Sequence, residues 1–266
     1  MLVPLKGAWA LIFGVSSGMG KAVALALADE GCNVIGVHFD LSAGQAQASA
    51  LAAELRSRGV EARFLNRNLV SAEARSEVLE LIREVTGDSG IRVLLHSVAF
   101  GTLLPFFPDT DGGGKYVTLK QLTMTVDVMA HSLVYWTQDL IAAGLLGPGA
   151  KIFGMTSSGG TRVLPNYGAV SAAKAALEAH CRQLAVELAP KGIAVNAIRA
   201  GTTITPALQK IPGSDGVIER CQELNPHGRL TRVEDVAEAI VQLSMSDSSW
   251  ITGNVIGVDG GEALVA

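Results

Sequence analysis

Ala8-Trp-Ala-Leu-Ile-Phe13, followed directly by Gly14-Val15-Ser16-Ser17-Gly18-Met19-Gly20, is the stretch that decides the fold. The first part is an apolar run of strand length. The second part carries three glycines where the amphipathic segment Lys21–Glu30 begins. Glycines at such a junction let the backbone turn tightly and approach a pyrophosphate, whose charge meets the N-terminus of the following helix. The stretch therefore predicts a dinucleotide site between a first strand and a first helix.

Two other interpretations of these glycines have to be weighed. An ordinary glycine-rich turn between a strand and a helix would look the same by spacing alone. A P-loop is excluded, because Val15 stands where its leading glycine should be and Ala22 offers no hydroxyl to magnesium.

The composition excludes several classes of protein. The chain has 266 residues, 48% of them hydrophobic, which suffices for a large core in one α/β domain. A formal net charge of −4 gives no basic footprint for nucleic acid. The longest uncharged stretch, 93–108, contains Pro and Gly and is too short for a bilayer span, so we expect no membrane partner. The apolar run 8–15 leads into the glycine turn and is interpreted as a strand rather than a signal peptide.

The cysteines point to a reducing compartment. Cys32, Cys181 and Cys221 are odd in number and widely spaced, which argues against a disulfide framework and against a metal site. We therefore expect a cytoplasmic protein that holds no metal.

Apolar runs of strand length alternate with helical periodicity along the whole chain. Most runs are unbroken, as is typical of strands buried on both faces. The predicted strands are 8–13, 33–37, 62–65, 93–96, 151–155, 193–198 and 255–258. The predicted helices are 19–30, 42–58, 71–85, 119–143, 167–188 and 233–243. The alternation predicts one α/β domain over residues 1–266, with a doubly wound, parallel, seven-stranded sheet and helices on both faces, which is the Rossmann fold.

Two segments interrupt the alternation. Residues 106–115 carry Pro-Asp-Thr-Asp-Gly-Gly-Gly and are predicted to form a surface loop. Residues 206–229 are irregular around Pro-Gly-Ser-Asp-Gly at 212–216. There we expect a mobile lid, inside a substrate-binding segment at about 202–229.

Residues 38–40, His-Phe-Asp, end the second predicted strand, where a side chain can read the ribose 2′ position. The Asp40 carboxylate could accept from a 2′-hydroxyl and would repel a 2′-phosphate, and Ser17 in the glycine turn supplies no cation to offset that charge. The sequence therefore favours NADH over NADPH. The alternative for Asp40 is an N-cap of the helix at Ser42, and the alternative for His38 is a half-buried structural role.

Tyr167 and Lys174 stand seven residues apart in Tyr-Gly-Ala-Val-Ser-Ala-Ala-Lys, nearly two helical turns, so they share a helix face with Ser171. Thr156-Ser157-Ser158 ends the fifth predicted strand just before this helix. A lysine so placed can bind nicotinamide-ribose hydroxyls, and its charge lowers the pKa of a neighbouring phenol. The tyrosine can donate to an oxygen that gains negative charge.

Taken together, these motifs resemble the short-chain dehydrogenase/reductase superfamily over essentially the whole chain. The matching stretches are the glycine turn 14–20, Thr156-Ser157-Ser158, Ser171-Ala-Ala-Lys174-Ala-Ala-Leu177, Val195-Asn196-Ala-Ile-x-Ala-Gly201 with Thr205, and Val258-Asp259-Gly260-Gly261.

Three departures narrow this resemblance to one branch. The usual tyrosine four residues before the lysine is Val170, the usual Asn-Asn-Ala-Gly is His-Ser-Val-Ala at 96–99, and the usual helix asparagine is Met129. All three are similar to the bacterial enoyl-acyl-carrier-protein reductases, as is the six-residue gap between Tyr167 and its lysine. Ser157 differs even from the commonest members of that branch, which carry a second tyrosine there.

Enoyl reduction itself favours the displaced tyrosine. Hydride adds to Cβ, and charge develops on an oxygen two bonds further away than in ketone reduction. Moving the phenol back one helical turn, about 5 Å of rise, could meet this need. Val170 leaves no phenol at the ketone-reducing place. The alternative is that Tyr167 is a core tyrosine in a degenerate reductase.

The resemblance implies an NAD(P)H-dependent reductase for the trans-2 double bond of an enoyl thioester in fatty acid synthesis. Tyr167 would stabilise the enolate oxygen, Lys174 would anchor the ribose, and Ser157 would bond near the thioester or the nicotinamide. Asn68-Leu69 could contact adenine or close a loop. Cofactor contacts are expected from Gly14, Ser16, Ser17, Gly18, Met19, Gly20, His38, Asp40, Asn68, Leu69, Ser97, Val98, Ala99, Thr156, Lys174, Gly201, Thr203 and Thr205.

The resemblance also implies partners. The thioester would be carried on acyl carrier protein or coenzyme A, and a homotetramer would form through helices 119–143 and 167–188. A basic rim could dock an acidic carrier or be only a solvated face; its members are Lys210, Arg220, Arg229 and Arg232. Two other functions stay open: a carbonyl or hydroxysteroid-type dehydrogenase, and a non-catalytic regulator that binds the dinucleotide.

Overall fold

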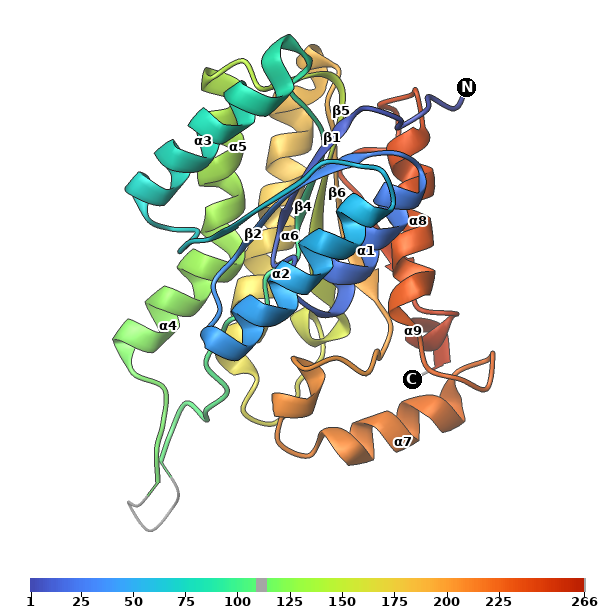
Figure 1. Cartoon of the computed structure of the whole chain (residues 1–266). Helices are drawn as coiled ribbons and strands as arrows, with labels where there is room; N and C mark the ends of the chain where they lie inside the picture. Colours follow the sequence, from blue (N-terminus) through green and yellow to red (C-terminus); the bar gives the residue numbers. More distant parts are fainter. Residues whose placement is uncertain (109–113, 266) are drawn as a thin grey trace.

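One parallel sheet forms the centre of the computed structural model, which describes residues 1–108 and 114–265 (Figure 1). Its strand order is β3-β2-β1-β4-β5-β6-β7, and every neighbouring pair is parallel. The strands are β1 (Trp9–Phe13), β2 (Asn33–His38), β3 (Ala62–Asn66), β4 (Ile91–His96), β5 (Leu146–Ser157), β6 (Ala194–Ala200) and β7 (Val255–Val258). The predicted doubly wound sheet is confirmed. The winding reverses between β1 and β4, and ligands of such sheets bind at this reversal, beyond the carboxyl ends of the strands.

The unbroken apolar runs follow from burial on both faces of the sheet. In β1, Leu11 and Phe13 face one core, whereas Ala10 and Ile12 face the other, and all four are fully buried. A polar residue at any of these positions would be buried without water, so strict alternation of polar and apolar residues is absent from β1.

Helices cover both faces of the sheet (Figure 1). The first core packs under α3 (Ala72–Thr86), α5 (Ser132–Ala142) and α6 (Gly168–Leu188), and the second packs under α1 (Gly18–Asp29), α2 (Ser42–Ser57) and α8 (Val233–Met245). No helix in the described part of the chain is long and apolar enough to cross a bilayer.

The predicted helix 119–143 is interrupted. It consists of α4 (Leu119–Val126), a π-helical turn (Asp127–His131) and α5, and Met129 lies inside the turn. The hydroxyl of Ser132 donates to the Val128 carbonyl at 2.8 Å, a local bond of the kind that loosens a regular helix. Wide turns of this type often occur at functional sites.

The prediction of an irregular 206–229 segment is wrong in part, because it contains the helix α7 (Ser214–Leu224). Gly213, at φ 76°, turns the chain into this helix, which explains the turn signal there. α7 buries only Ser214, and its apolar side chains at 217, 218, 221 and 224 recur at helical spacing but stay half-buried or exposed. The proline and glycine turn signals at 212–216 outweighed that spacing in the sequence. The predicted loop at 106–115 lies partly outside the described residues, and its described flanks are irregular.

Candidate active site

The glycine turn packs so closely that two of its glycines cannot be replaced without movement. Gly14 adopts φ 79°, and a Cβ built on it would overlap the Ser97 carbonyl oxygen after β4. A Cβ on Gly20 would overlap the Gly14 carbonyl oxygen. The backbone thus folds back on itself at the start of α1, where N–H groups and an exposed Ser17 face outward. These residues fit a dinucleotide pyrophosphate, which requires this cradle at a helix N-terminus.

The other predicted cofactor residues gather at the same edge of the sheet. Ser97, Val98 and Ala99 follow β4, and Gly201 follows β6. Thr205 lies against the glycine turn, since its methyl carbon would be 3.6 Å from a Cβ on Gly18. The structure therefore brings together segments that are almost two hundred residues apart in the chain.

The carboxylate of Asp40 pairs with the imidazole of His38 after β2. His38 Nδ1 lies 2.9 Å from Asp40 Oδ2, and His38 is buried while the Asp40 side chain is 31% exposed. The N-cap of α2 is Leu41, so the N-cap interpretation of Asp40 is wrong. His38 is more buried than expected, and its ring supports Asp40 instead of facing solvent.

Asn66 at the end of β3 fixes the backbone of Asp40, a role that the sequence did not reveal. Its amide accepts from the Asp40 N–H and donates to the Asp40 carbonyl, both at 2.9 Å. The two residues are 26 positions apart, so only the pairing of β2 with β3 could have pointed to this contact.

Asn68 and Leu69 have separate local tasks. Asn68 Oδ1 accepts from the Val70 N–H at 3.2 Å, which closes the loop after β3. Leu69 is buried, and its carbonyl accepts from Trp136 Nε1 at 3.0 Å. The loop-closing alternative for Asn68 is therefore confirmed, although its exposed position still borders the site.

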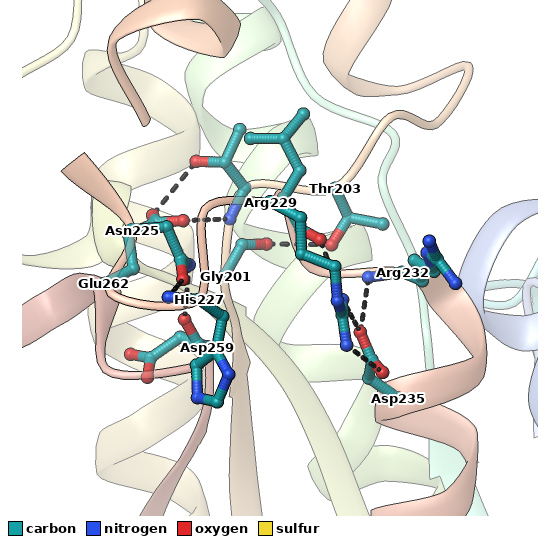
Figure 2. Close-up of polar contacts among 11 residues, drawn as sticks. Gly201, Thr203, Asn225, His227, Arg229, Arg232, Asp235, Asp259 and Glu262 are labelled. Atoms are coloured by element: carbon teal, nitrogen blue, oxygen red, sulfur yellow. Dashed lines mark hydrogen bonds and ion pairs between the residues drawn. The ribbon is translucent and has the colours of Figure 1, made fainter. Parts of the chain in front are cut away.

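Glu262 ties the helix α9 (Glu262–Val265) to the loop after β6 (Figure 2). This buried carboxylate accepts from the Thr202 N–H at 2.9 Å and from the Thr202 hydroxyl at 3.0 Å. The neighbouring Thr203 hydroxyl donates to the Gly201 carbonyl at 2.9 Å. Glu262, which sequence reasoning missed, thus anchors the predicted cofactor loop through Thr202.

The end of the 202–229 segment is anchored beside this loop (Figure 2). Asn225 donates to the Asp259 carbonyl at 3.0 Å, and Arg229 forms a two-point ion pair with Asp235 at 2.6 and 2.9 Å. Because Arg229 is already paired, the predicted basic rim loses one of its members. A cavity of about 340 Å³ opens between Thr203 and the start of α8, away from Tyr167.

Tyr167 immediately precedes α6, and its ring lies against Gly159 in the turn after β5. A Cβ on Gly159 would stand 2.5 Å from Cε1 of the ring. Burial raises the pKa of the phenol, and the neighbouring Ser157 side chain lowers it in part. The expected lowering of this pKa by Lys174 is therefore wrong, because the loss of hydration outweighs other effects. The phenol stays protonated at neutral pH and can act as a hydrogen-bond donor.

The ammonium of Lys174 is buried nearly two helical turns further along α6. Its Nζ donates to the Met155 carbonyl at 2.7 Å and to the Val98 carbonyl at 3.4 Å. Burial lowers the pKa of Lys174 to about 8, while the nearby Glu178 and Cys181 raise it. The lysine thus joins the ends of β4 and β5 and keeps a charge that depends on pH near neutrality.

An apolar shell surrounds the ring of Tyr167. Val170 and Met129 pack against it, with Leu103, Leu164 and Ile211 at the border. The Phe106 ring lies directly on Gly168, where a Cβ would overlap it. The positions that carry polar groups in the ordinary family pattern therefore form an apolar wall here.

His96 at the end of β4 is a neutral, buried group beside Lys174. Its Nε2 lies 2.7 Å from the Ser132 hydroxyl, which itself donates to Val128, so His96 is the donor of this bond. Burial and the charge of Lys174 lower the pKa of His96 to about 3.

A glycine cradle after β1 and a Tyr–Lys pair at the start of α6, both at the carboxyl edge of one parallel sheet, define a nucleotide-dependent oxidoreductase of the short-chain dehydrogenase/reductase class. Residues 14–262 match the family model described as Enoyl-(Acyl carrier protein) reductase, and the chain belongs to this family.

Known relatives of this chain carry out more than one kind of reduction. The enoyl-[acyl-carrier-protein] reductase [NADH] of Escherichia coli K12 is 31% identical over 175 residues, 65% of this chain and 64% of that protein. The L-xylulose reductase of Bos taurus is 29% identical over 259 residues, 97% of both chains. The solved enoyl-[acyl-carrier-protein] reductase (NADH) of Aquifex aeolicus VF5 covers 98% of both chains with a TM-score of 0.84 at 24% identity, and so shares the fold.

Proposed function

We propose that this protein is an enoyl-thioester reductase that uses NADH or NADPH to saturate the trans-2 double bond of an acyl chain in fatty acid synthesis. The observation that carries the proposal is the place of the phenol. Tyr167 stands at the very start of α6, while Val170, one turn nearer to Lys174, is buried in an apolar wall. This arrangement suits an oxygen that is remote from the carbon receiving hydride.

Tyr167, Ser157 and Lys174 each have a separate role in stabilising the charge that develops during reduction. A nicotinamide held by these residues would supply the hydride for Cβ. The protonated phenol of Tyr167 donates to the thioester oxygen as negative charge develops there, and the Ser157 hydroxyl supports the phenol. Lys174, held by the Met155 and Val98 carbonyls, binds the ribose hydroxyls and keeps the local potential positive. Water delivers the proton to Cα.

NADH is the cofactor that Asp40 favours. Its carboxylate is partly exposed at the end of β2, and Asn66 fixes its backbone. A 2′-phosphate would meet this negative charge, whereas a 2′-hydroxyl could donate to it. The remaining cofactor contacts proposed are the glycine turn, residues 97–99, and the loop with Gly201, Thr203 and Thr205.

The acyl chain would lie along the apolar shell of Tyr167, between Phe106 and Ile211, with the 202–229 segment as a mobile cover over the substrate. A carrier protein could approach Lys210 and Arg220, which are exposed. We propose a homotetramer formed through α4, α5 and α6, a state that size-exclusion chromatography with light scattering would reveal.

The experiment that tests the function is NADH oxidation with crotonyl thioester against acetoacetyl thioester, each on coenzyme A and on acyl carrier protein. Turnover with the enoyl substrates supports the proposal. Turnover with the ketone alone would instead favour a carbonyl reductase, as the similarity to L-xylulose reductase also allows. Tight NADH binding without any turnover would favour a regulator.

A further inference from the structure

Glu178 lies one helical turn after Lys174 on α6 and is held in place by the end of β5. The hydroxyl of Thr156 donates to Glu178 Oε1 at 2.6 Å. The residue before it, Met155, accepts from the Lys174 ammonium at 2.7 Å. Two consecutive residues of one strand therefore hold an anion and a cation of the neighbouring helix.

The three side chains meet in a small space beside Gly160. A Cβ built on this glycine would lie 3.3 Å from Lys174 Cβ, 3.5 Å from Glu178 Oε1 and 3.7 Å from Thr156 Oγ1. The turn after β5 thus closes over the carboxylate, and the half-buried Glu178 has little room to swing away from the lysine.

The groups around Lys174 differ in charge. Glu178 and Cys181, further along α6, raise the pKa of Lys174, and the charge of Lys174 in turn lowers the pKa of His96 at the end of β4. Burial raises the pKa of Cys181 to about 12, so it remains a thiol, and the pKa of His96 is lowered to about 3, so it remains neutral. Of these three groups, Glu178 is the one that brings a carboxylate. Arg182, one helical turn after Glu178 on α6, is a further charged residue that acts on Cys181.

We propose that Glu178 is a positioning residue for Lys174: clamped by Thr156, its carboxylate keeps the lysine protonated and directed at the cofactor ribose. The inference rests on the cofactor-binding role proposed for Lys174, and it does not depend on which substrate is reduced. Burial alone would drive the ammonium toward its neutral form, because a buried charge without a counter-charge is unfavourable.

The test measures NADH affinity by fluorescence from neutral to alkaline pH. In the wild type, affinity should fall as pH rises through about 8, because the Lys174 ammonium then loses its proton. Glu178→Gln should move this fall to lower pH by on the order of one pH unit, because a nearby opposite charge, even one outside ion-pair distance, raises the pKa of a buried ammonium. Glu178→Asp, which keeps the charge, should restore most of the wild-type profile.

Two further variants separate this role from a general effect on the helix. Thr156→Val releases the clamp and should shift the fall in the same direction by a smaller amount. Glu187→Gln alters an exposed carboxylate on the same helix, bonded to Gln183, and should leave the profile unchanged. If Glu178→Gln weakens binding equally at all pH values, the proposal is overturned. Should Glu178→Gln fail to fold, the Thr156→Val profile decides.

A second measurement does not rely on cofactor binding or turnover. Competitive acylation of lysines, read by peptide mass spectrometry across pH, reports the titration of Lys174 itself. A lower titration point in Glu178→Gln supports the inference even if the enoyl assay fails. An unchanged titration point would overturn it while leaving the reductase proposal intact.

Discussion

Tyr167 and Gly159 are in direct contact, with 2.5 Å between ring atom Cε1 and the place where a side chain on Gly159 would begin. Only a residue without Cβ lets the phenol lie flat beside the end of β5. The position of the proposed hydrogen-bond donor is therefore set by a glycine in the turn that precedes its helix.

Gly159→Ala should displace the phenol and lower kcat for the enoyl substrate. A shift of about 1 Å in a reacting group can reduce the rate on the order of 100-fold. NADH affinity should change little. Steady-state kinetics in which the enoyl substrate and NADH are varied in turn would distinguish an effect on kcat from an effect on NADH binding. Gly147→Ala is the matched control, because a Cβ there meets nothing within 4 Å. Equal kinetics for both variants would contradict the assigned contact.

Tyr167→Phe removes only the hydroxyl from a buried ring. Loss of one donor to a developing oxyanion lowers kcat by roughly 100- to 1,000-fold. The apparent NADH dissociation constant and Tm should stay near the wild-type values, since the ring still fills its apolar shell. Because burial raises the phenol pKa, the wild-type donor should stay protonated through neutral pH. Tyr116→Phe, at an exposed ring, is the control. A fully active Tyr167→Phe would remove the phenol from the mechanism.

Asp40→Ala should improve the use of NADPH relative to NADH. Removing one negative charge near a phosphate relieves on the order of 1–3 kcal/mol at the effective dielectric of a protein surface, or roughly 5- to 150-fold in the ratio of kcat/KM values. Glu61→Ala, just before β3 and so at the opposite end of the strands from Asp40, should leave this ratio unchanged. A ratio that stays constant in Asp40→Ala would mean that another group reads the ribose.

Glu262→Ala should weaken cofactor binding from outside the cofactor site. It leaves the N–H and hydroxyl of the half-buried Thr202 without their acceptor, and loss of hydrogen bonds to a charged group destabilises a protein by about 1.5–3 kcal/mol. We expect a Tm lowered by several degrees and a raised KM for NADH, with kcat less affected. Thr202→Val removes one of the two bonds and should give a smaller change in both. An unchanged KM for NADH alongside a lowered Tm would confine Glu262 to a purely structural role.

The sequence predicted the strands of the sheet better than it predicted α7 and the π-helical turn, for a physical reason. An apolar run such as β1 reports burial on two faces directly, so its place and neighbours follow from pattern and alternation. The helix α7 buries a single residue, Ser214, and the turn signals of 212–216 at its start hid the helical spacing of its half-buried apolar residues. The π-helical turn around Met129 is a change of backbone hydrogen-bond register, accompanied by the Ser132–Val128 bond, and apolar periodicity does not reveal such a change.

The candidate site likewise has parts that the sequence predicted and parts that it did not. The glycine turn and the Tyr–Lys pair are local spacings, and the sequence carries them in full. Asn66, Glu178 and Glu262 act through partners 26, 22 and 60 positions away, and such contacts exist only once the strands are paired. The raised pKa of Tyr167 likewise arises from burial, which the residue's neighbours in the chain do not specify.

The bond between Glu262 and Thr202 has a practical consequence for anyone preparing this protein. A fluorescent label or cross-linker placed on α9 (Glu262–Val265) would lie within three residues of the carboxylate that anchors the loop after β6 and could disturb that bond. A label on the exposed Met1 leaves this contact untouched, so labelling work should begin from that position.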